Sequence, residues 1–181
     1  MNSFRKCIYV FFIVCLLPAC EFKCSIGSAK KNKPHEAFKP VIKDGAIISN
    51  GIQLTTGSVK LRKAYLVFEN GEEVPANNVI DYKSPVKLLL LIDSGWRSQN
   101  GHVWLGGAEK VLSEEGKVVL DEEDLFAPFS EGVSADDAKI IGLTVTINIT
   151  KGYTSSFTVF FKVWDKKGKG YIEGNYKLFS K

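Results

Sequence analysis

Histidine is scarce in this sequence, with only His35 and His102 among 181 residues. A serine or cysteine nucleophile activated by a histidine base therefore has little to be built from. Zinc has too few ligands, and the glycine-rich patterns that bind dinucleotides and phosphates are absent, since Gly106-Gly107 alone does not form one. The sequence predicts a protein that is not an enzyme and that has no catalytic residues, metal site or cofactor.

Carboxylates are the remaining groups on which hydrolysis would depend. They occur at a predicted hairpin turn (114–115), in an acidic run (121–124) and at the start of a short predicted helix (136–137). Acids at such places are usually solvated or cap a helix, whereas hydrolysis needs two that converge. A carboxylate-dependent hydrolase therefore stays an alternative rather than the expected function.

No apolar run is long enough to cross a membrane. The longest, Cys7–Leu17, has eleven residues and as a helix spans about 16 Å, roughly half of the hydrocarbon core. It follows Arg5 and Lys6, which gives the charged and apolar regions of a secretory signal peptide in their usual order. We expect residues 1–19 to be a signal peptide.

The segment after this run is Leu17-Pro18-Ala19-Cys20. It resembles the lipobox of bacterial lipoproteins, which has leucine at −3, a small residue at −1 and a cysteine that becomes the mature N-terminus, although Pro18 departs from the commoner small residue at −2. The resemblance covers residues 1–20 and implies cleavage before Cys20, a thioether-linked diacylglycerol on its sulfur and a further acyl chain on its amine. Two or three acyl chains hold a protein stably at a bilayer. An ordinary secretory signal that ends near a cysteine is the alternative.

The residues around Cys20 bear on location. In bacteria with two membranes, aspartate directly after the lipidated cysteine favours the inner membrane, and Glu21 at this position implies the outer membrane of the cell envelope. Cys7 and Cys15 leave with the signal peptide, so Cys24 is the only thiol expected in the mature chain. We therefore expect no intramolecular disulfide.

Residues 20–40 are predicted to be a flexible basic tether behind the lipidated cysteine. Positions 21–40 carry five lysines, two glutamates and two prolines without an apolar period. Residues 41–181 carry 17 basic and 18 acidic side chains. The basic isoelectric point of the whole chain therefore comes from residues 1–40. We expect no nucleic-acid partner, and the tether lysines face either anionic lipid head groups or solvent.

The remaining residues, 41–181, alternate as in a β protein. Turn signals such as Asn70-Gly71 separate the apolar runs. The predicted strands are 58–68, 86–92, 103–112, 117–120, 140–149, 154–164 and 171–179. Seven to nine such strands predict an all-β fold, an antiparallel two-sheet sandwich of immunoglobulin-like or C2-like type, with a closed barrel as second choice. One or two short helical turns are expected, the clearest at 134–138.

Two segments of this body, Trp104–Phe129 and Trp164–Gly170, are similar to parts of small, uncharacterised bacterial lipoprotein domains. This resemblance implies no activity and transfers no functional residue. Trp164 has the opposite parity to Phe157 and Val163, which places it on the outer face of its sheet or in a cap at one end.

The segment 93–104 is the strongest candidate for a binding site. It is a polar stretch between two apolar strands that contains Trp96, Arg97 and Trp104, and indole faces stack on sugars, arginine or peptide. These three residues are the predicted ligand contacts. The alternative is structural, with Trp96 as a lid over the core and Trp104 as part of the core.

The sequence as a whole predicts a lipid-anchored protein of the bacterial envelope that binds a protein or a glycan without catalysis. Its membrane partner is engaged through the lipid on Cys20. A structural subunit of a larger envelope assembly is a further alternative, and an apolar patch or an unpaired edge strand is the feature that would favour it.

Overall fold

The computed structural model describes residues 35–81, 83–147 and 156–180. The chain divides into two compact units, 1–33 and 34–181, and every described residue belongs to the second. The predicted signal peptide, Cys20, Cys24 and most of the predicted tether lie outside the described residues.

Two β-sheets form the domain, as the alternation of the sequence predicted. In spatial order the first sheet consists of β1 (Val41–Lys43), β2 (Ala46–Ile48), β4 (Lys60–Phe68), β6 (Val86–Ser94) and β11 (Ile140–Val145). The second consists of β3 (Gln53–Thr56), β13 (Tyr171–Ser180), β12 (Ser156–Asp165), β8 (Leu105–Ser113) and β9 (Val118–Glu122), with β5 (Val79–Ile80) beside β13. All pairs are antiparallel except β2 with β4 and β5 with β13.

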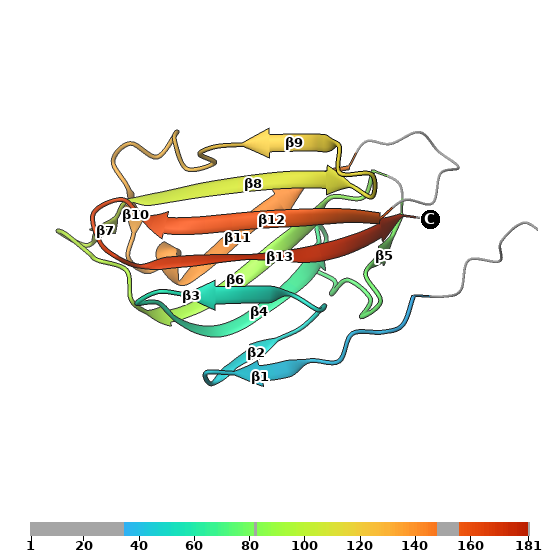
Figure 1. Ribbon diagram of the computed structural model, residues 1–181. Helices are drawn as coiled ribbons and strands as arrows, with labels where there is room; N and C mark the ends of the chain where they lie inside the picture. Colours follow the sequence, from blue (N-terminus) through green and yellow to red (C-terminus); the bar gives the residue numbers. More distant parts are fainter. Residues whose placement is uncertain (1–34, 82, 148–155, 181) are drawn as a thin grey trace, which may run out of the picture. The chain divides into compact units, whose positions relative to one another are not determined.

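The two sheets pack face to face as a sandwich. Figure 1 shows β8, β12 and β13 in a layer in front of β6 and β11. Side chains alternate along each long strand, so one set points between the layers, and Leu66 and Leu88 of the first sheet join Val159 and Leu178 of the second in one fully buried core. The antiparallel sandwich is therefore confirmed.

The strand count also agrees once length is considered. Of the thirteen strands in the described residues, eight have four residues or more, within the expected seven to nine. The other five are pairs or triplets, including β7 (His102–Val103) and β10 (Val133–Ser134), which pair with each other in a separate small sheet. Such short strands carry too few residues for an alternation to be recognised in the sequence.

The predicted facing of residues in β4 is wrong in its second half. The pairing of β4 with β6 shifts register on both sides of Leu61. Beyond this bulge Ala64 and Leu66 are fully buried, whereas Tyr65 is only half-buried. The alternation of Val59, Leu61, Tyr65 and Val67 in the sequence predicts one shared face, but the inserted residue turns Tyr65 and Val67 to the opposite face, where Val67 is still only 4% exposed.

The segment 93–104 is a hairpin rather than one long loop. Gln99 and His102 exchange both backbone hydrogen bonds, at 2.9 and 3.0 Å, around Asn100 and Gly101. Both turn residues have positive φ, 51° and 79°, which asparagine and glycine tolerate best. Asn100-Gly101 is a signal for a tight turn, but the prediction from the sequence did not place a hairpin at this position.

The short helix predicted at 134–138 is a 3-10 helix, η1 (Asp137–Lys139). The pattern of the sequence predicts Ser134 as the N-cap, but the N-cap is Asp136, whose side chain makes no capping hydrogen bond, and the Ser134 hydroxyl accepts from the backbone N–H of Asp137 at 3.0 Å from two positions earlier. No helix in the described residues has the length and apolar character needed to cross a membrane.

Residues 35–40, assigned by the sequence to the tether, contact the sandwich. The ring of His35 stacks on Phe179 with 3.6 Å between centroids, and the ring of Phe38 lies over Gly51. The compact unit therefore begins at residue 34, several residues before the predicted end of the tether. The aromatic rings of His35 and Phe38 make the contacts that attach this segment.

Candidate functional site

All three predicted ligand contacts lie beside the end of the sandwich where β12 turns into β13. The indole of Trp96 packs against the core, and its Nε1–H donates to the carbonyl of Ala138 at 3.0 Å. The backbone N–H of Arg97 donates to the buried carboxylate of Asp165 at 2.6 Å, and its guanidinium donates to the carbonyl of Lys167 at 3.1 Å. These contacts match the lid alternative for Trp96, while the Arg97 side chain remains exposed.

Trp104 lies against the same β12–β13 turn. Its Nε1–H donates to the carbonyl of Ser130 at 3.1 Å, and the ammonium of Lys167 lies 2.9 Å from its ring centroid. Lys167 thus contacts both Arg97 and Trp104 and covers one indole face. Ligand binding by Trp96, Arg97 and Trp104 stays a prediction.

A different surface, on the outer face of the second sheet, is hollowed into a groove of about 580 Å³. We call it the outer groove. Its floor and walls come from the middle of β8, β12 and β13 and from the end of β9. It is lined by Ala108, Glu109, Lys110, Asp121, Glu122, Glu123, Phe160, Phe161, Lys162, Trp164, Glu173, Gly174 and Asn175.

Aromatic rings lie along this groove. Strand pairing places Trp164 opposite Gly106, and the indole fills the space that a Cβ on Gly106 would need. Tyr171, opposite Trp164 on β13, lies in the same way over Gly57. Phe160, four residues before Trp164 on the same face, is 40% exposed. The rings lie over neighbouring backbone rather than between the sheets, so they stay half-open to solvent.

The hollow continues past Trp164 toward the β12–β13 turn. A second hollow of about 460 Å³ shares Lys162 and Trp164 with the outer groove and extends it to Tyr171 and Gly170. The three aromatic residues therefore border one continuous path along β12.

The charged side chains of the outer groove are mostly paired. Lys162 and Glu173 form an ion pair at 2.9 Å, and Lys110 and Asp121 form another at 2.7 Å. Glu122 and Glu123 make no ion pair within the described part of the chain, so the groove carries a net negative charge.

Glu109 lies beneath the groove and points inward. It pairs across the strands with Phe161 of the core, it is 1% exposed, and neither carboxylate oxygen has a hydrogen-bond partner among the described residues. Burial raises the pKa of Glu109 to about 7. Burial and the nearby Glu109 charge raise the pKa of Tyr176, whose hydroxyl is also unpartnered. A carboxyl in this position does not reach a ligand in the groove.

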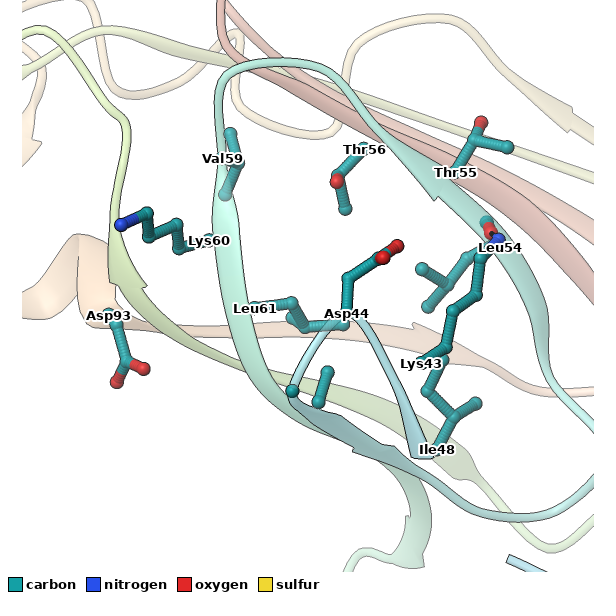
Figure 2. Close-up of a pocket in the computed structure, with 12 residues that line it drawn as sticks. Lys43, Asp44, Ile48, Leu54, Thr55, Thr56, Val59, Lys60, Leu61 and Asp93 are labelled. Atoms are coloured by element: carbon teal, nitrogen blue, oxygen red, sulfur yellow. Dashed lines mark hydrogen bonds between the residues drawn. The ribbon is translucent and has the colours of Figure 1, made fainter. Parts of the chain in front are cut away.

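A further pocket, of about 580 Å³, lies at the open edge of the sandwich between β3 and the β1–β2 hairpin. Its lining includes the core residues Ile48, Leu54 and Leu61, and the Lys43 ammonium donates to the carbonyl of Leu54 at 2.8 Å across the edge. Figure 2 shows Asp44 reaching over this pocket while Lys60 and Asp93 point away. Its carboxylates therefore do not converge.

The described residues hold no group of three or more histidine, cysteine, aspartate or glutamate side chains arranged to hold a metal ion. His102 is exposed at its hairpin turn, with Nδ1 3.1 Å from the carbonyl oxygen of Asn100. The ring of His35 is stacked on Phe179. Neither histidine lies in the outer groove or in the edge pocket.

Parity in the sequence left the outer face of the sheet and a cap at one end as positions for Trp164, and the structure places it on the outer face. The outer groove itself was missed, because it depends on which residues of β8 and β13 lie beside Trp164. No family model matches the chain, and no curated protein matches it either.

Proposed function

We propose that the protein is a lipoprotein of the bacterial envelope that binds a protein or glycan partner through the outer groove without catalysing a reaction. The observation that supports binding is the continuous path of aromatic rings that the adjacent strands β12 and β13 present to solvent. Aromatic side chains in a solvent-open hollow on a rigid sheet supply contact area at little cost in conformational entropy.

Anchoring is proposed from the order of charged region, apolar run and Leu17-Pro18-Ala19-Cys20. In this proposal Cys20 carries the lipid, Glu21 directs the protein to the outer membrane, and the sandwich extends into the surrounding compartment. The short apolar run fits a cleaved signal better than a permanent span.

Partition of the native protein between detergent and aqueous phases tests the anchor. We expect the wild-type protein in the detergent phase and the Cys20→Ser variant either in the aqueous phase or retained with its signal uncleaved. Recovery of the wild-type protein in the aqueous phase contradicts the anchor.

A role as a structural subunit has one observation in its favour. Ile42, Ile47 and Ile140 are 80%, 48% and 59% exposed, and strand pairing places them in one row across the outer face of the first sheet, with Lys63 and Leu91 between Ile47 and Ile140. A stripe of this kind is typical of a surface that another protein covers. Aspartate substitutions in the stripe that leave ligand binding intact but release the protein from an envelope complex would favour this second function.

A further inference from the structure

We infer that the ligand of the outer groove is an uncharged glycan chain, which stacks its sugar rings on Trp164 and on its cross-strand neighbour Tyr171 and hydrogen-bonds to the Trp164 indole and to the Asn175 side chain farther along the groove. The inference rests on the proposed function, and it names the class of ligand. Its support comes from the backbone, the aromatic rings, the free polar groups and the charge of the groove.

The backbone of the groove offers nothing to an extended peptide. The strands that form its floor, β8, β12 and β13, each have a hydrogen-bonded neighbour on both sides. Their backbone N–H and C=O groups are therefore engaged, and a peptide cannot join this face as an added strand. Recognition here has to use side chains.

The aromatic side chains suit a ligand with flat apolar faces. Trp164 covers Gly106 with one side of its ring and is half-exposed. Tyr171 does the same over Gly57, and the Lys162 ammonium lies 5.7 Å from its ring centroid, so a sugar on Tyr171 would share the ring with this lysine. Sugar rings present C–H groups on their faces and hydroxyls on their edges, so they stack on such rings and leave the hydroxyls free. Four residues of strand separate Phe160 from Trp164, about 13 Å, which is room for more than one sugar.

The polar groups of the groove are free to bind hydroxyls. Trp96 and Trp104 use their indole N–H groups within the fold, but the Nε1–H of Trp164 has no hydrogen-bond acceptor in the described part of the chain. The side-chain amide of Asn175, in the same groove, is likewise without a partner there. Of the three tryptophans, Trp164 is thus the one equipped both to stack and to donate.

Charge selects against an anionic ligand. Lys162 and Lys110 are held by Glu173 and Asp121, and Glu122 and Glu123 remain as an unpaired negative surface. Lys169 adds a positive charge at the Tyr171 end of the path, so the repulsion of a phosphorylated or uronic-acid glycan acts at the end of the groove that Glu122 and Glu123 line. An uncharged chain meets no such barrier.

Titration of the full-length, detergent-solubilised protein tests this inference. The probes are neutral β-linked oligomers of glucose and of N-acetylglucosamine, an oligogalacturonate, and a tryptic digest of casein as a source of unstructured peptides. Tryptophan fluorescence and calorimetry report binding. We expect a neutral oligomer to bind, with an affinity that rises with chain length, and the anionic oligomer not to bind.

Variants assign the binding to the groove. We expect Trp164→Ala to weaken the binding of the neutral oligomer tenfold or more, and Asn175→Ala, which removes no core contact, to weaken it severalfold. Phe129→Ala removes a 53% exposed aromatic residue outside the groove and should leave the affinity unchanged. Circular dichroism and urea unfolding establish that each variant is folded.

The failures are distinguishable. Binding of casein peptides in place of oligosaccharides, with loss in Trp164→Ala, overturns the glycan class but keeps the groove as a binding site. Oligosaccharide binding that survives both Trp164→Ala and Asn175→Ala overturns the assignment to this groove. If no probe binds at millimolar concentration, both the glycan inference and the proposed binding function are contradicted.

Discussion

The indole of Trp164 lies over Gly106 of the neighbouring strand, where no other residue leaves room for it. The aromatic surface of the outer groove therefore depends on a residue that contributes no side chain. Tyr171 over Gly57 repeats the relationship one strand away. The glycines shape this surface as much as the rings do.

Gly106→Ala should displace the indole of Trp164. We expect the free energy of unfolding to fall by about 1 kcal/mol, because the half-exposed ring can move outward and relieve the overlap, and oligosaccharide affinity to fall with it. Urea unfolding and titration measure the two effects. Gly142→Ala is the matched control, since its Cβ would meet the flexible Lys87 side chain at 3.0 Å and Leu89 at 3.5 Å, an ordinary contact distance. Equal losses in both variants would contradict the role given to Gly106.

Glu109 makes the stability of the domain depend on pH. Its pKa is about 7 in the folded protein and 4.5 in the unfolded chain, so the unfolded chain loses this proton first as pH rises. The free energy of unfolding should therefore decrease between pH 4.5 and 7, by about 3 kcal/mol if this carboxyl acts alone. Urea unfolding across this range measures the decrease.

Glu109→Gln tests the assignment of that pH dependence. We expect the variant to match the wild type near pH 5 and to exceed its stability near pH 8, because the amide never ionises. Glu122→Gln, opposite Glu109 on β9 but exposed, is the control and should follow the wild type at both pH values. A Glu109→Gln variant with unchanged pH dependence would refute the assignment.

Asn50 and Asn78 join the two sheets through a buried amide pair. Asn50 donates to Asn78 at 2.9 Å and accepts from the Leu66 N–H at 3.1 Å, while Asn78 donates to the carbonyl of Lys177 at 2.7 Å. Because Asn78 has φ 55°, Asn78→Gly keeps the backbone relaxed and removes only the hydrogen bonds. We expect it to cost about 2–4 kcal/mol of unfolding free energy.

Asn77→Ala is the control for this pair. The side chain of Asn77 makes one local hydrogen bond, to the backbone N–H of Val79 at 3.2 Å, and should contribute under about 1 kcal/mol. Thermal or urea unfolding compares the two variants. A loss in Asn78→Gly no larger than that in Asn77→Ala would show that the amide pair does not stabilise the packing of the sheets.

Asp165 fixes the segment that contains Trp96. Its buried carboxylate accepts from the backbone N–H groups of Arg97, at 2.6 Å, and Lys167, at 2.9 Å. Asp165→Asn turns an NH₂ toward one of these donors, so we expect a loss of about 1–3 kcal/mol and faster amide hydrogen exchange at residues 95–98. Unchanged exchange there would contradict this role, and Asp93→Asn, an exposed acid in the same region, is the control.

The long strands were predictable because their alternation reports the core directly. Phe157, Val159, Phe161 and Val163 share one parity in β12 and are all buried. The short strands were not predictable, because the pairs and triplets of β1, β2, β5, β7 and β10 are defined by their neighbours. The bulge at Leu61 was hidden for a related reason, since only the pairing partner reveals an inserted residue.

The candidate site was harder to predict than the fold. Parity allowed Trp164 an outer face or an end cap, but the groove depends on the register that brings Gly106 and Ala108 beside it. Trp96 attracted attention because it lies in a polar segment, yet whether an indole is open or engaged depends on a distant acceptor such as Ala138. The sequence identifies a tryptophan, but only the tertiary structure shows whether its ring face and its indole N–H are free to contact a ligand.

The mass of the mature N-terminal peptide, measured on protein purified from its native membrane, tests the central claim most directly. The account predicts a chain that begins at Cys20 and whose cysteine carries a diacylglyceryl thioether with an acylated amine. A peptide that begins elsewhere, or a residue 20 with an unmodified thiol, would contradict it.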